Sequence, residues 1–172
     1  DNCYAETLMD KRYHRVEWGQ RKVRGVPGSV GTRVRTSHAN RRKPYSWQNK
    51  AADFMAKHGR RQRVFCSSLA DVFDNQVPDE WRVGLWQTIR DTPGLDWLLL
   101  TKRPENIAKM LLPAIGEAEL WPWKNVWLGS TAENQENANR RGKLLREIPA
   151  AVHFLSCEPL LSEIQFEPKT LL

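Results

Sequence analysis

Cysteine is scarce in this sequence, which contains only Cys3, Cys66 and Cys157. An odd number of cysteines at scattered positions does not suit the disulfide framework of a small secreted protein. It suits reduced thiols or metal ligands better. The three thiols could meet at one end of a sheet to bind zinc, but no close pair of Cys or His residues supports a zinc site.

Long apolar runs are also missing. No stretch approaches the roughly 18 apolar residues that span a bilayer, and the N-terminus lacks the basic-then-apolar order of a secretion signal. We therefore expect no membrane partner and a cytoplasmic location. The 40% of hydrophobic residues, with eight Trp and five Phe, exclude a disordered chain because they supply the apolar area that offsets conformational entropy.

Acidic residues are rare in one part of the chain. Residues 11–63 contain 16 Lys and Arg but only Glu17 and Asp53 as acids, whereas residues 64–172 contain 11 Lys and Arg and 15 acids. Lys and Arg gain affinity for nucleic acids by releasing counterions from phosphates. The stretch 11–63 therefore indicates a nucleic-acid partner. The alternative is a solvated loop whose charge keeps the protein in solution.

The first third of the chain has weak periodicity. Residues 3–15 predict a short helix, and residues 16–45, rich in Gly, Pro and positive charge, predict a basic loop insertion. A helix is expected from Ser46, as its N-terminal cap, to about His58, with Gly59 as its stop.

From residue 63 to 161 the pattern becomes regular. Four apolar segments predict strands: RVFCSS, DWLLLTKRP, NVWLGST and AVHFLSCEP. Helical segments separate them: DEWRVGLWQTIRDT, ENIAKMLLPAI and ENQENANRRGKLLREI. Strands that are apolar along their whole length are typical of a parallel sheet covered by helices. Successive βα units predict a (β/α) barrel or a doubly wound sheet within one α/β domain over residues 1–172.

In both architectures ligands bind beyond the carboxyl ends of the strands. The polar residues that follow the four strands are Ser67, Ser68 and Asp71, then Thr101, Lys102 and Arg103, then Ser130, Glu133 and Asn134, then Ser156 and Glu158. Together they would form a polar bowl. Loops after strands are polar in any case, so this pattern favours function only modestly.

Several of these residues have the chemistry of a site. Lys102 and Arg103 could bind phosphate or carboxylate, and Ser67 and Asp71 could contact the same substrate. Glu133 and Glu158 are the candidates for general acid or base, or for binding a ligand amine or hydroxyl.

The alternatives for these residues are structural. Glu133 could instead favour the N-terminus of the next helix, and Asp71 could only cap a turn. Glu158 precedes Pro159 and has no helix to serve, so it is the better functional candidate.

Taken together, CYAE, RVFCSSLADVFDNQVPDEW, LLLTKRPENI, NVWLGSTAENQENANRR and AVHFLSCEPLL resemble a family named for the phage proteins gp thirty-seven and gp sixty-eight, a domain of unknown function also found in bacteria. The resemblance implies a bacterial or phage-infected host. It also implies a cysteine loop like that of radical S-adenosylmethionine (SAM) enzymes, with Cys3 as the third ligand of a [4Fe–4S] cluster. SAM or substrate would then contact Ser130, Glu133, Asn134 and Glu158.

Family members carry two cysteines before the position of Cys3 and further strands after CEPLL. The resemblance therefore implies that the sequence is the central part of a larger TIM-type barrel. By itself it would bind no cluster and be inactive in that chemistry, because one thiolate cannot hold a [4Fe–4S] cluster. Uncovered sheet edges would favour self-association.

Three functions remain open. The first is a radical SAM-like iron–sulfur enzyme whose substrate is a nucleic acid. The second is a non-catalytic nucleic-acid-binding protein that uses residues 11–63 as a phosphate clamp. The third is a phosphate-binding barrel hydrolase that uses Lys102, Arg103 and Glu158.

Overall fold

The computed structural model describes residues 6–16, 33–66, 69–115 and 121–166, and the chain divides into two compact units, Asp1–His38 and Ala39–Leu172. The first unit contains η1, a π-helix over Thr7–Arg12. The helix expected over 3–15 therefore ends earlier than predicted. The reason is local, since His14 has a left-handed φ of 47° that a helix cannot continue.

The second unit begins with two helices where one was expected. They are α2, His38–Gln48, and α3, Ala51–His58. The prediction that Ser46 caps a helix is wrong, because Ser46 lies inside α2, and the predicted loop 16–45 is helical from His38 onward. Gly59 does end α3, with a left-handed φ of 65° and its N–H donated to the carbonyl of Met55.

Pro44 explains the missed helix. Proline normally breaks a helix interior because it lacks an N–H and its ring clashes with the preceding turn, yet Pro44 lies inside α2 and is buried. Tertiary contacts hold this helix: Tyr45 donates to Asp91 over 3.2 Å, and Gln48 Oε1 accepts the N–H of Gly94 over 2.8 Å. These contacts dock α2 on the segment that leads into the second strand, which no local pattern reveals.

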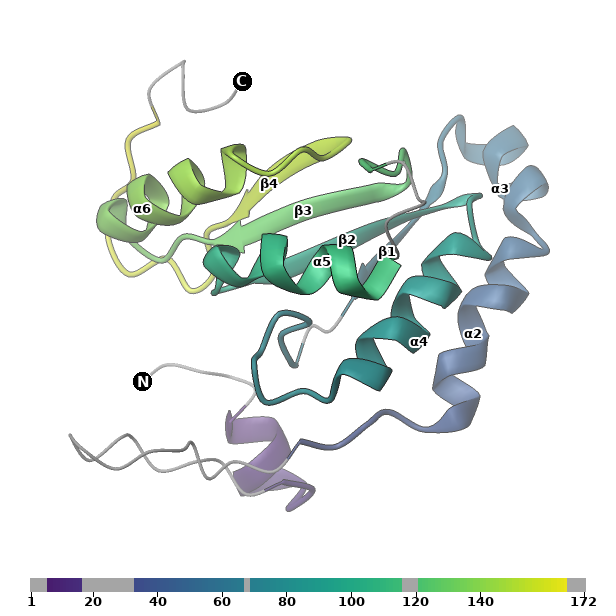
Figure 1. Ribbon diagram of the computed structural model, residues 1–172, viewed down its shortest axis with the longest axis horizontal. Coiled ribbons are helices and arrows are strands. Elements are labelled where there is room, and N and C mark those ends of the chain that lie inside the picture. The colour runs from purple at the N-terminus through teal and green to yellow at the C-terminus, as the bar shows by residue number, and fades with distance from the viewer. Residues whose placement is uncertain (1–5, 17–32, 67–68, 116–120, 167–172) are drawn as a thin grey trace. The chain divides into compact units, whose positions relative to one another are not determined.

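The remainder of this unit alternates strands and helices (Figure 1). The strands are β1, Gln62–Cys66; β2, Leu95–Thr101; β3, Val126–Thr131; and β4, Val152–Ser156. The helices are α4, Asp79–Arg90; the 3₁₀ turn η2, Pro104–Asn106; α5, Ile107–Ile115; and α6, Gln135–Arg146. The predicted order of strands and helices is therefore confirmed.

The four strands form one parallel sheet in the order β1-β2-β3-β4. Leu99 of β2 is in register with Cys66 of β1 and with Leu128 of β3, and Gly129 is in register with Phe154 of β4. This sheet is not closed into a barrel. The expectation of a TIM-type barrel goes further than the described residues, which contain four strands and the three helical connections between them, whereas such a barrel needs eight strands.

One face of the sheet carries the core. Along β2 the residues alternate between buried and half-buried, which is the period of a strand with one covered face. The buried residues of the sheet and of α4, α5 and α6 form a single apolar cluster that includes Trp86, Ile89, Leu95, Trp97, Leu99, Ile107, Leu111, Val126, Leu128 and Leu145. The three helices therefore cover the same face of the sheet.

The opposite face of the sheet is apolar but only partly buried. Phe65 is 47% exposed, and the guanidinium of Arg63 lies 4.7 Å from the centre of the Trp127 ring. The ring of Phe154 lies over Gly129, where an added Cβ would approach it to 2.2 Å. In the described part of the chain, no helix is both long and apolar enough to cross a membrane.

Candidate functional site

The carboxyl ends of the four parallel strands lie along one edge of the sheet (Figure 1). This edge is where ligands bind in α/β folds. The predicted site residues that the structure places after or at the ends of the strands are Asp71, Lys102, Arg103, Ser130, Glu133, Asn134 and Glu158. The candidates Cys3 and Ser67 lie outside the described residues.

Asp71 joins the loop after β1 to the end of β2. One carboxylate oxygen accepts the N–H of Phe73 over 2.9 Å, which closes a turn. The other accepts the hydroxyl of Thr101 over 3.0 Å, the N–H of Lys102 over 3.1 Å and the guanidinium of Arg103 over 3.2 Å. Asp71 caps a turn, as one prediction allowed, and it also holds the guanidinium of Arg103 and the backbone of Lys102.

A buried arginine of α4 also holds the loop between β1 and α4. Arg82 of α4 is 4% exposed and donates to the carbonyl of Asp74 over 3.0 Å and to that of Val72 over 3.4 Å. It also pairs with Asp79 one turn earlier in α4. A buried guanidinium with these partners gives Asp71 a rigid support.

Glu133 is the centre of a second charged cluster, after β3. Its two carboxylate oxygens lie 2.7 Å from Nη1 of Arg141 and 3.4 Å from Nζ of Lys102. Its backbone carbonyl accepts the N–H of Leu161 over 2.8 Å. Arg141 also donates to the carbonyl of Thr131 over 2.8 Å, so it ties α6 to the end of β3.

The protonation of Glu133 follows from this environment. Burial by itself raises the pKa of the Glu133 carboxyl, but a hydrogen bond from the backbone and the positive charges of Arg141 and Lys102 outweigh it and lower the pKa below its ordinary value. Glu133 is therefore ionised at neutral pH. A carboxylate in this state can hold a cation in place or accept a proton.

Lys102 and Arg103 are neighbours in sequence but are held by different acids. Arg103 pairs with Asp71, and Lys102 pairs with Glu133. Both remain accessible, with 50% of the Lys102 side chain and 39% of the Arg103 side chain exposed. The arrangement presents two anchored positive charges to solvent at the end of β2.

The remaining candidates differ in their availability. Ser130 is fully buried and its hydroxyl donates to the carbonyl of Thr101 over 2.9 Å, and the Asn134 side chain accepts the N–H of Asn137 over 2.9 Å as the cap of α6. Both side chains serve the fold in this state. Glu158 is exposed, and within the described residues its carboxylate has no hydrogen-bonding partner.

Sequence reasoning missed the two buried arginines, Arg82 and Arg141. For Arg141 a signal was present, because Ala138, Arg141 and Leu145 recur at helical spacing on the buried face of α6. A cation on an apolar helix face indicates a buried acidic partner. Glu133, eight residues earlier, is that partner.

One family model matches the sequence, over residues 1–170, and the family is described as a protein of unknown function, DUF5131. No curated protein and no solved structure gives a significant match. The match shows a domain of unknown function. It supports neither the phage family name nor the relation to radical SAM enzymes.

Proposed function

The chain belongs to this family of unknown function, and we propose that it is an enzyme that holds an anionic group of its substrate, a phosphate or a carboxylate, at the carboxyl ends of its strands. The observation that carries the proposal is the pair of anchored, partly exposed cations Lys102 and Arg103. An anchored cation binds an anion at a lower entropic cost than a freely moving one.

The donors that remain free support this function. Arg has five N–H donors and Lys has three, whereas the ion pairs with acidic side chains use only Nη1 of Arg103 and one contact of the Lys102 ammonium, with Glu133. The other donors can reach a phosphate or carboxylate oxygen. In this proposal Asp71 and Glu133 position the two cations and do not touch the substrate.

Glu158 is the proposed catalytic acid or base. It follows β4, two strands away from Lys102, which is roughly 10 Å at the usual spacing of strands. A substrate whose anionic group is bound at Lys102 and Arg103 would have to extend across the end of β3 to reach it. This arrangement suits hydrolysis of a phosphate-bearing substrate, with Glu158 activating water.

The test is a calorimetric titration with inorganic pyrophosphate as the probe. We expect Lys102→Ala and Arg103→Ala each to weaken binding several-fold, and Lys109→Ala, which removes an exposed cation of α5, to leave it unchanged. Unchanged affinity in both site variants would overturn the proposal. Loss of affinity in all three variants would point to non-specific attraction by net charge.

Radical SAM chemistry is a separate proposal, supported by the resemblance of the CYAE segment. A cluster of that kind needs three thiolates from one loop. The two cysteines that the structure describes, Cys66 and Cys157, lie on or beside the opposite edge strands β1 and β4, roughly 14 Å apart at the usual strand spacing. Among the described residues no three potential ligands gather. These residues do not fit the cluster, and no step is derived through it.

Anaerobic reconstitution of the chain with iron and sulfide tests the cluster directly. The cluster proposal requires two cysteines besides Cys3 in the same loop, so this chain should show no broad absorbance near the blue end of the visible spectrum. A protein with those cysteines should show it and should lose it on Cys3→Ala. Absorbance that survives this substitution would contradict the role of Cys3.

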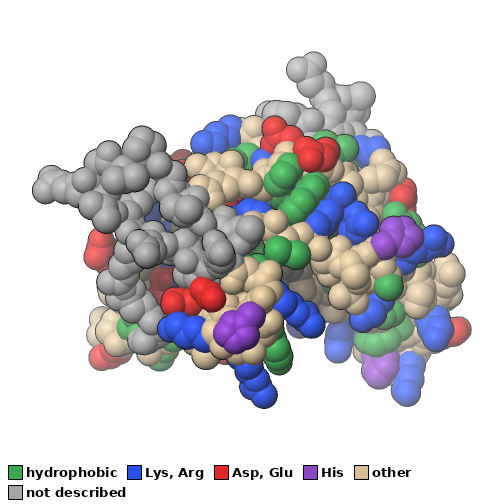
Figure 2. Space-filling view, turned by 90° about the horizontal axis from the view of Figure 1, so that it is seen from below, with side chains coloured by type: hydrophobic (Ala, Val, Ile, Leu, Met, Phe, Trp, Pro, Cys, Tyr) green, Lys and Arg blue, Asp and Glu red, His purple; other side chains and the backbone are tan. Residues whose placement is uncertain are grey.

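Nucleic-acid binding is favoured by one further observation. Within the second unit, α2, α3, β1 and the short segments between them carry exposed cations, namely Arg42, Lys43, Lys50, Lys57, Arg60 and Arg63. Figure 2 shows exposed Lys and Arg side chains on one face, among uncharged and acidic ones. We expect affinity for a single-stranded oligonucleotide to fall steeply with salt. A double substitution, Lys50→Glu with Lys57→Glu, should reduce the salt slope, and a slope that does not change would contradict this role.

Self-association through sheet edges is likewise a proposal. Its support is that β1 and β4 each pair with one neighbour only, among the strands that the structure describes, and an edge left with free N–H and C=O groups can pair with another chain. Sedimentation equilibrium over a range of concentrations measures it, and a mass that stays that of the monomer throughout would rule it out.

A further inference from the structure

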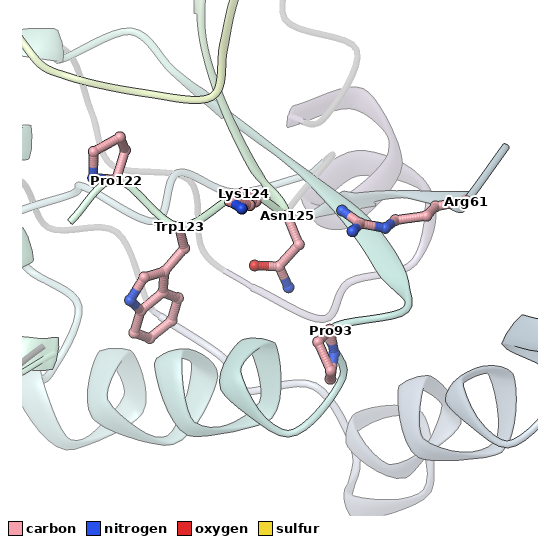
Figure 3. Close-up of a pocket in the computed structure, with 6 residues that line it drawn as sticks. All are labelled: Arg61, Pro93, Pro122, Trp123, Lys124 and Asn125. Atoms are coloured by element: carbon pink, nitrogen blue, oxygen red, sulfur yellow. The ribbon is translucent and has the colours of Figure 1, made fainter. Parts of the chain in front are cut away.

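A pocket of about 450 Å³ lies at the opposite end of the sheet from the charged clusters. It is lined by residues that come just before β1, β2 and β3, namely Arg61, Pro93, Pro122, Trp123, Lys124 and Asn125 (Figure 3). Its volume falls in the range of roughly 300–1,000 Å³ that is usual for small-molecule sites. It shares no residue with the carboxyl-end site, so ligand binding there is independent of the proposed enzymatic function.

We propose that this pocket binds a small planar aromatic molecule that carries a phosphate or carboxylate group. The apolar part of the lining consists of Trp123, Pro93 and Pro122. Trp123 is the aromatic ring among these three, and it favours an aromatic ligand because aromatic pairs gain beyond the burial of their area.

Trp123 is held in a fixed orientation. Its ring packs at 81° against the fully buried Trp86, with 5.7 Å between ring centres, and the guanidinium of Arg90 lies 5.6 Å from the Trp123 ring. Trp121 packs against the same Trp86 ring at 88°. A ring fixed in advance binds a ligand without a further loss of side-chain freedom.

Asn125 supplies a polar group at a defined position. It is 8% exposed, and its side-chain N–H₂ donates to the carbonyl of Ile89 over 3.2 Å. In Figure 3 its side-chain oxygen lies on the side of Trp123. This oxygen can accept a hydrogen bond from an N–H of the ligand, which favours a nitrogen-containing ring.

The positive charge of the residues that line the pocket favours an anionic ligand. Arg61 and Lys124 line the pocket, and among the residues that the structure describes no acidic one does. Arg61 is partly offset by Asp96, at 3.4 Å, but its guanidinium points toward Asn125 and keeps further donors (Figure 3). Lys124 is exposed and has no ion-pair partner among the described residues. Two cations beside an aromatic wall fit a ring with an attached phosphate or carboxylate.

Calorimetric titration tests the proposal with three probes: adenosine monophosphate, benzoate and inorganic phosphate. We expect the monophosphate to bind more tightly than inorganic phosphate, because only the former uses the aromatic wall. Lys124→Glu should weaken its binding about tenfold, since the substitution replaces an attractive charge with a repulsive one. Trp123→Leu should lower the affinity for the monophosphate to that for inorganic phosphate.

Two controls test whether net charge alone attracts the monophosphate. Lys143→Glu reverses an exposed charge on α6 and Lys109→Ala removes an exposed cation of α5, and both should leave monophosphate binding unchanged. Lys124 is exposed, so its variant folds even if Trp123→Leu does not. Equal binding of the monophosphate by the wild type and Lys124→Glu, or an equal loss of binding with Lys124→Glu and Lys143→Glu, would overturn the proposal.

Discussion

Different interactions join the loops at the two ends of the parallel sheet. At the carboxyl ends, ion pairs join the loops: Asp71 holds Arg103, and Glu133 holds Lys102 and the buried Arg141. At the amino ends, packed aromatic rings join the loops. There Trp121 and Trp123 both pack edge-on against Trp86.

The difference shows which charges belong to the fold and which are available to a ligand. A buried charge must be paired, and removing its partner leaves an uncompensated charge in a medium that solvates it poorly. At the amino ends the ion pair of Arg61 with Asp96 is partly exposed, and Lys124 has no ion-pair partner among the described residues. Charge substitutions should therefore lower stability more at the carboxyl ends than at the amino ends.

The largest effect is expected for Glu133→Ala, which leaves the buried Arg141 without its acid. We expect the free energy of unfolding to fall by about 3–5 kcal/mol, measured by urea denaturation. The double variant with Glu133→Leu and Arg141→Met should recover most of this loss, because apolar residues of similar size can replace a buried ion pair. If Glu133→Ala were as stable as the wild type, the fold would not depend on this ion pair, and the comparison would fail at the carboxyl ends.

The pH dependence of stability checks the same ion pair without a change of shape. The lowered pKa of Glu133 means that the folded state binds its proton less readily than the unfolded state does. The stabilisation is therefore complete above the ordinary carboxyl pKa of 4.5 and is lost as the pH falls through the lowered value. Glu133→Gln should lack this part of the pH profile, and an unchanged profile would assign it to another carboxyl group.

Much of the fold could be predicted from the sequence. The apolar strands and the helices between them are strong local patterns, and the structure places all four strands in one parallel sheet. The register and the open edges could not be predicted, because they depend on packing between segments far apart in sequence. The helix α2 was missed for the same reason, since its Pro44 is accommodated by tertiary contacts.

The site was predictable by position but not by role. The rule for parallel sheets placed Asp71, Lys102 and Glu133 at one edge, and they are linked there. The sequence could not show that Ser130 would be used within the sheet, or that Arg141 would point toward Glu133. The role of such a residue depends on which face of its strand or helix packs against the core. In a strand, a shift of one residue moves every side chain to the opposite face.

A smaller effect is expected for Asp71→Asn, which keeps the shape of the side chain but removes its charge. One of its oxygens accepts three hydrogen bonds, from Thr101, Lys102 and Arg103. An amide cannot accept all of them, so we expect a loss of about 1.5–3 kcal/mol, typical for hydrogen bonds to a charged group. Urea denaturation measures it, with Asp53→Asn on the exposed side of α3 as the matched control. A loss no greater than that of the control would show that this oxygen does not hold the end of β2.

The smallest effect comes from a matched pair of exposed lysines, one at each end of the sheet. Lys102 pairs with Glu133 and has half of its side chain exposed, whereas Lys124 has no ion-pair partner among the described residues. Exposed ion pairs contribute about 0–1 kcal/mol, so Lys102→Ala should lower the free energy of unfolding by up to that amount and Lys124→Ala should not change it. Urea denaturation at low and high salt distinguishes them, because salt screens an exposed pair and should reduce the difference between the two variants. A larger loss for Lys124→Ala would mean that the amino ends also depend on charge, and the contrast between the two ends would then fail.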